Sequence, residues 1–193
     1  MDNLEHYITN KTYDEIKIGD IAKLTRTLTM RDIKLFAIVT GDMNPAHLDE
    51  EYANTDVFHQ IIGHGIWTAS MFSVLLGMQL PGPGTLYLDQ SLKFLKPVHL
   101  NDTITASVKV IKKDDEHKFI TFETLCIDEE GNHLLEGEAL ILAPSEKVSW
   151  KKLPLPEIEV TPNQNELNAK KAISCWINEG GADLLPVNQS NLS

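Results

Sequence analysis

The chain has 193 residues, of which 42% are hydrophobic and 23% are charged, and its formal net charge is −11. This length indicates one domain with a small appendage, and the hydrophobic share is ordinary for a globular core. The negative charge argues against binding of nucleic acid or of an anionic membrane surface, because both depend on basic residues.

The two cysteines, Cys126 and Cys175, form neither a metal-binding spacing nor a disulfide framework, which indicates a reducing compartment. The first ten residues lack the basic start and apolar core of a signal peptide. The longest apolar stretch, residues 66–80, is too short and too polar to cross a bilayer. The sequence therefore predicts a cytoplasmic protein that does not enter a membrane.

The first half of the chain begins with a predicted strand over residues 21–29, rich in threonine and aliphatic residues. Thr29 and Asp32 have the spacing of a helix start, and Gly41 ends that short helix. Residues 42–63 have no clear period and are predicted to be a long loop. Loops of that length in compact domains usually carry function.

The second half is predicted as one helix followed by strands. Residues 64–79 are apolar on nearly all sides, which predicts a buried central helix, and the Pro-Gly-Pro-Gly segment at 81–84 stops it. Alternating apolar residues then predict successive strands, with a turn signal at residues 128–132; the strands are expected over residues 86–94, 103–110, 118–127 and 133–143. A central helix with antiparallel strands around it is an α+β fold.

The composition changes after residue 149, where proline and asparagine become frequent. We therefore expect a domain over residues 1–149 and a Pro/Asn-rich tail or linker over 150–193, with one short helix predicted within 167–178. Two interpretations of this tail stay open. It is either a partly disordered tail or the stub of a linker to a second domain.

The segment Gly41-Asp42-Met43-Asn44-Pro45-Ala46-His47 places a carboxylate and an imidazole five residues apart. Pro45 restricts the backbone between them, so a loop could present both in a fixed pose. The same spacing alone also fits an Asx-turn beside a surface histidine. Downstream, Gly63-His64-Gly65 precedes the apolar helix and can aim a backbone N–H from the helix start. An acid/base pair with such a donor suffices to add water across a double bond beside a carbonyl.

These segments resemble the R-specific enoyl-CoA hydratases of the MaoC-like group, enzymes of fatty acid metabolism with the hot-dog fold. The resemblance covers roughly residues 13–144, and its matching stretches are residues 36–52, 64–84 and 87–97. The likeness is greatest to the N-terminal hydratase module of bifunctional enoyl-CoA hydratase/phosphate acetyltransferase proteins. Association with a phosphate acetyltransferase is therefore one expectation, alongside a homodimer or a dimer of dimers.

The resemblance implies a lyase that reversibly hydrates trans-2-enoyl-CoA to (R)-3-hydroxyacyl-CoA by syn addition. Asp42 and His47 would position and activate the water, and Gly65 would offer its N–H to the thioester oxygen. Which of the two side chains handles which proton stays open. Ser73 would support the catalytic arrangement by hydrogen bonding, although a lone serine in an apolar helix could simply bond the carbonyl one turn back.

Substrate binding is assigned to Asn44, His64, Trp67 and Met71. Asn44 could instead hold the loop through backbone bonds, and the two large apolar residues could belong to the core. Lysines could meet the phosphates of coenzyme A or simply be solvated; they are Lys93, Lys96, Lys112 and Lys113. No cofactor is expected beyond the coenzyme A of the substrate itself.

Three alternatives compete with this interpretation. A zinc site at His47, His59 and His64 would need a spacing that matches no common motif, and no metal is expected. A thioesterase on the same fold would resemble enzymes with an acidic residue on the central helix, but residues 64–79 contain none. A non-catalytic acyl-thioester binding or assembly module would not need the catalytic pair.

Overall fold

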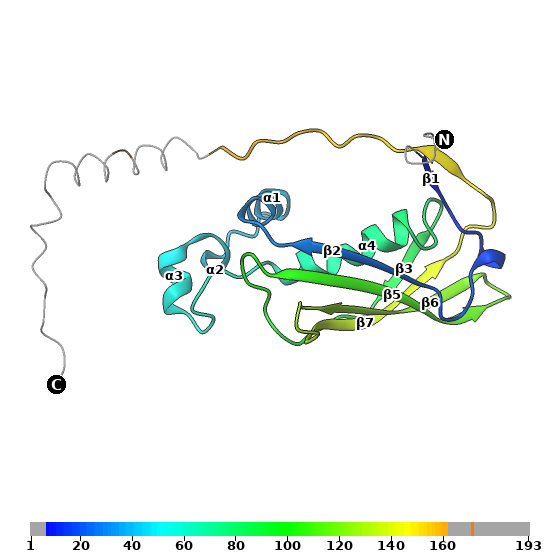
Figure 1. The fold of residues 1–193 in the computed structure, drawn as a ribbon, viewed down its shortest axis with the longest axis horizontal. Coiled ribbons are helices and arrows are strands. Elements are labelled where there is room, and N and C mark those ends of the chain that lie inside the picture. The colour runs from blue at the N-terminus through cyan, green and yellow to red at the C-terminus, as the bar shows by residue number, and fades with distance from the viewer. Residues whose placement is uncertain (1–6, 162–170, 172–193) are drawn as a thin grey trace, which may run out of the picture. The chain divides into compact units, whose positions relative to one another are not determined.

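The computed structural model describes residues 7–161 and residue 171, and Figure 1 shows the arrangement of their elements. The chain divides into two units, Met1–Leu155 and Pro156–Ser193, and the candidate site lies in the first. The short helix predicted within residues 167–178 falls outside the described residues, apart from residue 171. Within the described part, no helix is long and apolar enough to cross a membrane.

The main sheet has six antiparallel strands. Its path is β2 (Ile21–Thr27), β5 (Thr103–Asp114), β6 (Phe119–Ile127), β7 (His133–Leu142) and β3 (Leu86–Gln90), with β4 (Lys93–Phe94) also paired to β7. A separate pair joins β1 (Tyr7–Thr9) to β8 (Ser149–Lys151), and the 3-10 helix η1 (Tyr13–Glu15) follows β1. Strand β8 spans the predicted boundary at residue 149.

The helix α4 (Gly65–Met78) packs against this sheet (Figure 1). Alternate residues of β5 are fully buried and join the same hydrophobic cluster as the helix; they are Ile104, Ala106, Val108 and Val110. Period-two burial is what a strand shows when one face covers a core. The predicted α+β layout, with an antiparallel sheet around a central helix, is therefore confirmed.

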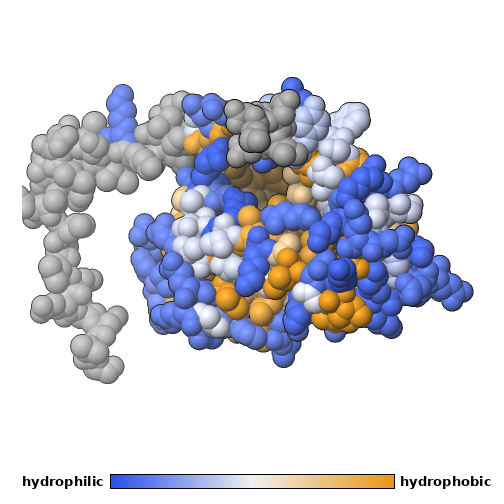
Figure 2. All heavy atoms as spheres, turned by 45° about the vertical axis from the view of Figure 1, so that its right-hand side comes forward, coloured by the Kyte–Doolittle hydropathy of each residue, from blue (hydrophilic) through white to orange (hydrophobic). Residues whose placement is uncertain are grey.

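The central helix has two different faces. One face is buried in the core and comprises Trp67, Thr68, Met71, Phe72, Leu75 and Leu76. On the other face, Ile66 is 55% exposed, and Val74 and Met78 are also exposed within the single chain. The expectation that α4 is buried on all sides is thus wrong for one chain. Figure 2 shows apolar patches on the surface of one side of the molecule.

Three helices precede α4 and lie near one another at one end of the sheet (Figure 1): α1 (Met30–Thr40), α2 (Pro45–Leu48) and α3 (Glu50–Thr55). The expected boundaries of α1 are confirmed, with a capping box between Thr29 and Asp32 and a left-handed Gly41 at its end. The expectation of an irregular loop over residues 42–63 is wrong in its first half. Helices of four and six residues are too short to show a hydrophobic period, and caps start them instead.

Candidate active site

Asp42 is placed by the end of α1. Gly41 adopts a positive φ of 78°, which turns the chain out of the helix. The backbone N–H of Asp42 then donates to the Thr40 hydroxyl at 3.2 Å, and its Oδ1 accepts from the N–H of Asn44 at 3.2 Å. The Asx-turn considered from the sequence is therefore present, but it holds an exposed carboxylate in a defined place beside the histidine.

His47 is 8% exposed, so it is not the surface histidine of the simpler interpretation. It lies in α2, which Asn44 starts by accepting from the N–H of Ala46 at 3.1 Å, with Pro45 in the first turn. The Nδ1 atom of His47 is 2.9 Å from the backbone oxygen of Ile62. Because a carbonyl only accepts, Nδ1 must carry the proton, and Nε2 keeps a free lone pair.

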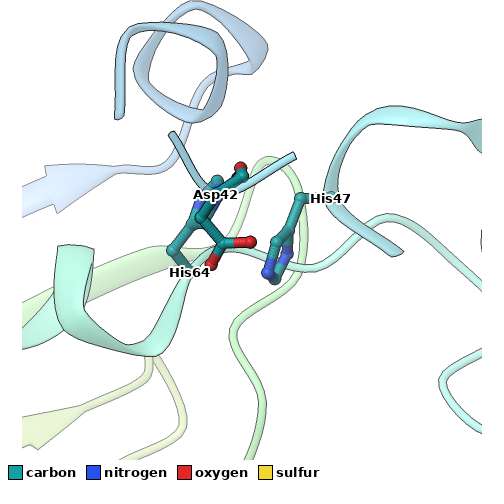
Figure 3. A group of neighbouring side chains, drawn as sticks. All are labelled: Asp42, His47 and His64. Carbon is teal, nitrogen blue, oxygen red and sulfur yellow. Dashed lines mark hydrogen bonds between the residues drawn. The ribbon is translucent and has the colours of Figure 1, made fainter. Parts of the chain in front are cut away.

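His64 lies against both groups (Figure 3). Its Nε2 is 3.1 Å from the backbone oxygen of Asp42, and its ring centroid is 3.9 Å from that of His47, with a tilt of 34° between the planes. Phe36 of α1 packs on the same ring at 5.0 Å. Burial lowers the pKa of His64 below its ordinary value, and this effect outweighs the bond to the Asp42 carbonyl, which raises it. The bond to that carbonyl needs a proton on Nε2, and the buried Nδ1 has no hydrogen-bond partner among the described residues, which favours the neutral ring.

Asp42, His47 and His64 each offer one potential metal ligand, and these three atoms lie within 4.8 Å of one another. A tetrahedral ion about 2.0–2.1 Å from both ring nitrogens would hold the two ring centroids roughly 5 Å apart. The two ring centroids lie closer than this, at 3.9 Å. His59, which the sequence added to a possible zinc set, is exposed and does not belong to the group. The arrangement suits hydrogen bonding better than metal coordination.

Gly65 is the first residue of α4, where the backbone N–H has no partner within the helix and the helix dipole adds positive charge. It lines a cavity of about 320 Å³ together with His47. A Cβ at this position would lie 3.0 Å from the Phe94 ring, so glycine leaves the approach to the N–H open. The structure therefore brings Asp42, His47 and Gly65 into one region.

The other residues assigned to the site lie elsewhere or have other contacts. Ser73 is on the exposed face of α4, about 12 Å along the helix from Gly65. Trp67 and Met71 belong to the buried core and are not among the residues that line the cavity. Asn44 caps α2. Within one chain, these side chains do not join the Asp42 and His47 group.

Most of the cavity wall is not predicted by the sequence. It is largely apolar and is lined by Phe58, Ile62, Thr68, Phe94, Leu95, Val98, Leu134 and Leu135, among others. The wall brings together segments from α2 to β7 that lie far apart in the sequence, so no local spacing signals it. Thr68 lines the cavity one turn after Gly65, and the hydroxyl of this threonine has no hydrogen-bond partner among the described residues.

The four lysines considered for coenzyme A have different surroundings. Lys96 is exposed and lines the cavity. Lys93 pairs with Glu136 at 3.0 Å, and Lys113 donates to the carbonyls of two residues near η1 at 2.8 and 2.6 Å. Lys112 is exposed on β5 and does not line the cavity. Lys96 is thus the one of the four at the cavity.

Comparison with known proteins adds independent findings. The protein-family description "MaoC like domain" matches residues 16–131. The (R)-specific enoyl-CoA hydratase of Rhodospirillum rubrum is 46% identical over 133 residues, which span 69% of this chain and 92% of that protein. The enzyme of the same name from Aeromonas caviae is 38% identical over 67% of this chain and 96% of its own length.

Solved structures give the same result. The unliganded R-hydratase PhaJ1 from Pseudomonas aeruginosa has a TM-score of 0.77 and 37% identity, with 80% of this chain and 99% of that chain covered. The (R)-hydratase from Aeromonas caviae has a TM-score of 0.66 and 38% identity, with 67% and 98% covered. The likeness therefore extends over nearly the whole of each of these structures.

Proposed function

The chain belongs to the MaoC-like family of hydro-lyases and has its hot-dog fold, as its sequence predicted, and from this premise we propose that it is an R-specific enoyl-CoA hydratase. It would reversibly add water to trans-2-enoyl-CoA to give (R)-3-hydroxyacyl-CoA. The observation that carries this proposal is that Asp42 lies beside His47, while His47 and Gly65, the first residue of α4, line one apolar cavity.

The proposed chemistry needs three groups. His47 Nε2 takes one proton from water while the water oxygen forms a bond to C3 of the enoyl thioester. The electrons of the C2–C3 double bond move toward the thioester oxygen, where the Gly65 N–H stabilises the enolate. The proton taken by His47 then passes by way of Asp42 to C2 on the same face, so that the enolate becomes the thioester again and both side chains return to their starting states. The tautomer imposed by the Ile62 carbonyl supports His47 as the base.

The substrate would bind with its acyl chain against the apolar wall, and Lys96 is placed to meet an anionic part of coenzyme A. Hydration is redox-neutral overall, and His47, Asp42 and the Gly65 N–H would supply its proton transfers and oxyanion stabilisation, so we propose no cofactor and no metal beyond the coenzyme A of the substrate. Ser73, Trp67 and Met71 stay predictions as site residues, although none of them meets the cavity within one chain.

An acyl-carrier-protein substrate is the second candidate. One relative, the mitochondrial 3-hydroxyacyl-[acyl-carrier-protein] dehydratase of Arabidopsis thaliana, is 35% identical over 67% of this chain. The net charge of −11 favours coenzyme A, because carrier proteins are themselves acidic and would be repelled. Equal turnover of crotonyl-CoA and crotonyl-carrier protein would contradict this preference.

We propose a homodimer in which a second copy covers the exposed apolar face of α4. Burying Ile66, Val74 and Met78 would remove from water the side chains that one chain leaves open on its central helix. A Val74→Glu variant should then run as a monomer in sedimentation, whereas unchanged mass would contradict the surface. A cytoplasmic location and an association with a phosphate acetyltransferase stay predictions.

The decisive experiment follows the absorbance of the enoyl thioester with purified protein and crotonyl-CoA, with chiral analysis of the product. Formation of (R)-3-hydroxybutyryl-CoA would support the proposal. Release of free thiol would instead support a thioesterase, which the absence of any acidic residue from α4 disfavours. Binding without turnover would support a non-catalytic module.

A further inference from the structure

His64 has no chemical step in the mechanism proposed above, yet it contacts each part of the site. It is 3% exposed, its Nε2 is bonded to the Asp42 carbonyl, and its ring packs at a tilt against that of His47. It is also the N-cap residue of α4, directly before Gly65. One side chain thus connects the acid/base pair to the helix that carries the oxyanion donor.

Packing alone does not account for an imidazole at this position. Because Nε2 must donate to a carbonyl, Nδ1 keeps its lone pair, and this atom is buried without a hydrogen-bond partner among the described residues. A buried polar atom that is left unpaired destabilises the fold. An apolar ring of similar size would fill the same space without that penalty. The hydrogen bond from Nε2 to the Asp42 carbonyl therefore explains why a histidine occupies this position.

The hydrogen bond from His64 to Asp42 joins residues much farther apart in the sequence than the other bonds of Asp42 do. Those with Thr40 and Asn44 lie within two residues and move with the loop itself. The bond from His64 crosses 22 residues and attaches Asp42 to the start of α4. Since Gly65 follows directly, this bond links the backbone of Asp42 to the residue next to the oxyanion N–H.

We propose that His64 is a positioning residue, which in its neutral form ties the backbone of Asp42 to α4 and so keeps the acid/base pair in register with the Gly65 N–H. The proposal rests on the proposed function and adds a role to it. The groups that face the ring are the uncharged Phe36 from α1, Asp42 from the segment after it and His47 from α2. A neutral ring avoids placing a second positive charge against His47 when His47 takes a proton.

Two amide variants separate this role from a structural one. In His64→Gln, the side-chain nitrogen reaches the place of Nε2 and can still donate to the Asp42 carbonyl. In His64→Asn, it reaches only the place of Nδ1, so that bond is lost. Asparagine is nevertheless a favoured N-cap residue, whereas His64 makes no side-chain cap bond. A positioning role therefore predicts that the Gln variant is the more active of the two. A purely structural role predicts that the Asn variant is the more stable and at least as active.

The experiment measures kcat, KM and the thermal midpoint of both variants with crotonyl-CoA. We expect His64→Asn to lose about 10–100-fold in kcat with KM nearly unchanged and an equal or higher midpoint, because small displacements of a catalytic group slow the reaction strongly. His64→Gln should keep most of the activity. An Asn variant as active as the Gln variant would overturn the proposal.

A double-mutant cycle tests whether His64 acts through Asp42. Adding His64→Asn to Asp42→Asn should cost little further activity, whereas a full additional loss would overturn the positioning role. If Asp42→Asn alone keeps full activity, the proposed mechanism fails instead. Hydrogen exchange keeps the test independent of turnover. The peptide containing residues 41–48 should exchange faster in the Asn variant than in the Gln variant, and equal exchange would also overturn the proposal.

Discussion

His47 donates its Nδ1–H to the backbone carbonyl of Ile62 over 2.9 Å, and this bond decides which ring nitrogen is available for chemistry. The N–H of Ile62 in turn donates to the carbonyl of Ala46 at 3.3 Å, and Ile62 forms a β-bridge with His99. The partner of His47 is thus itself anchored on both sides. The imidazole ring cannot flip without breaking a buried hydrogen bond, so Nε2 stays the nitrogen that is available for proton transfer.

His47→Asn should abolish most hydration while preserving the fold. The asparagine amide can still donate to the Ile62 carbonyl from the position of Nδ1, but nothing replaces the basic Nε2. Loss of a general base typically slows the reaction by about 10²–10⁴-fold, which steady-state kinetics with crotonyl-CoA would measure. His59→Asn is the matched control, because His59 is exposed and its φ of 58° suits asparagine. Equal turnover in the two variants would contradict the assignment.

Asp42→Asn should lose at least about 10²-fold in kcat, because an amide cannot carry out the proton transfer proposed for the carboxylate. Its side-chain oxygen can still accept from the Asn44 N–H, so the Asx-turn should persist and circular dichroism should not change. Asp49→Asn provides the control. Asp49 is exposed and caps α3 by accepting from the Tyr52 N–H, a task that asparagine performs equally well. If both variants were fully active, the proton-transfer role of Asp42 would be refuted.

Much of the fold could be predicted from the sequence because local chemistry specifies it. The Thr29 and Asp32 capping box starts α1 where their spacing predicted, and the alternation of β5 matches its buried face. The Asp128–Asn132 turn also closes as expected, with Gly131 at a positive φ. In each of these cases the information lies within a few residues of the chain.

The rest depended on contacts that sequence spacing does not carry. Helices α2 and α3 are set by caps and proline rather than by a hydrophobic period, so the sequence predicts a loop in their place. Ile62 accepts the hydrogen bond from His47 through its backbone carbonyl, and the residue type at this position does not reveal such a contact. Strands β1 and β8 pair with each other although most of the domain's sequence lies between them. Each has only three residues, which is too short to show an alternating pattern.

Stability should fall on acidification through the titration of His64. Burial lowers the pKa of this group below its ordinary value of 6.5, so the unfolded chain binds the proton more readily. The contribution is fully present above pH 6.5 and is lost as the pH falls from there through the lowered folded value. Urea unfolding of the wild type and His64→Gln between about pH 5 and 8 isolates it, because other groups cancel in the difference. A difference independent of pH would contradict the assignment.

Gly65→Ala should separate stability from activity. Alanine is a better helix residue than glycine, by up to about 1 kcal/mol in a helix interior, so the thermal midpoint should hold or rise. The new methyl group would lie 3.0 Å from the Phe94 ring and push it or the substrate away from the N–H, so kcat should fall. Phe94→Leu, alone and combined with Gly65→Ala, shows whether the ring is the obstacle. Undiminished kcat in Gly65→Ala would argue against an oxyanion site here.

Lys96→Ala should weaken the binding of coenzyme A thioesters and leave the chemistry intact. Lys96 is exposed at the cavity, where a surface ion pair is worth about 0.2–1 kcal/mol, so KM for crotonyl-CoA should rise by about 1.4- to 5-fold. Crotonyl-N-acetylcysteamine lacks the phosphates, and its KM should not change. Lys112→Ala removes the same charge from an exposed site on β5 that does not line the cavity, so it controls for the net charge of the protein. Equal KM values for crotonyl-CoA in the two lysine variants would show that Lys96 does not meet the phosphates.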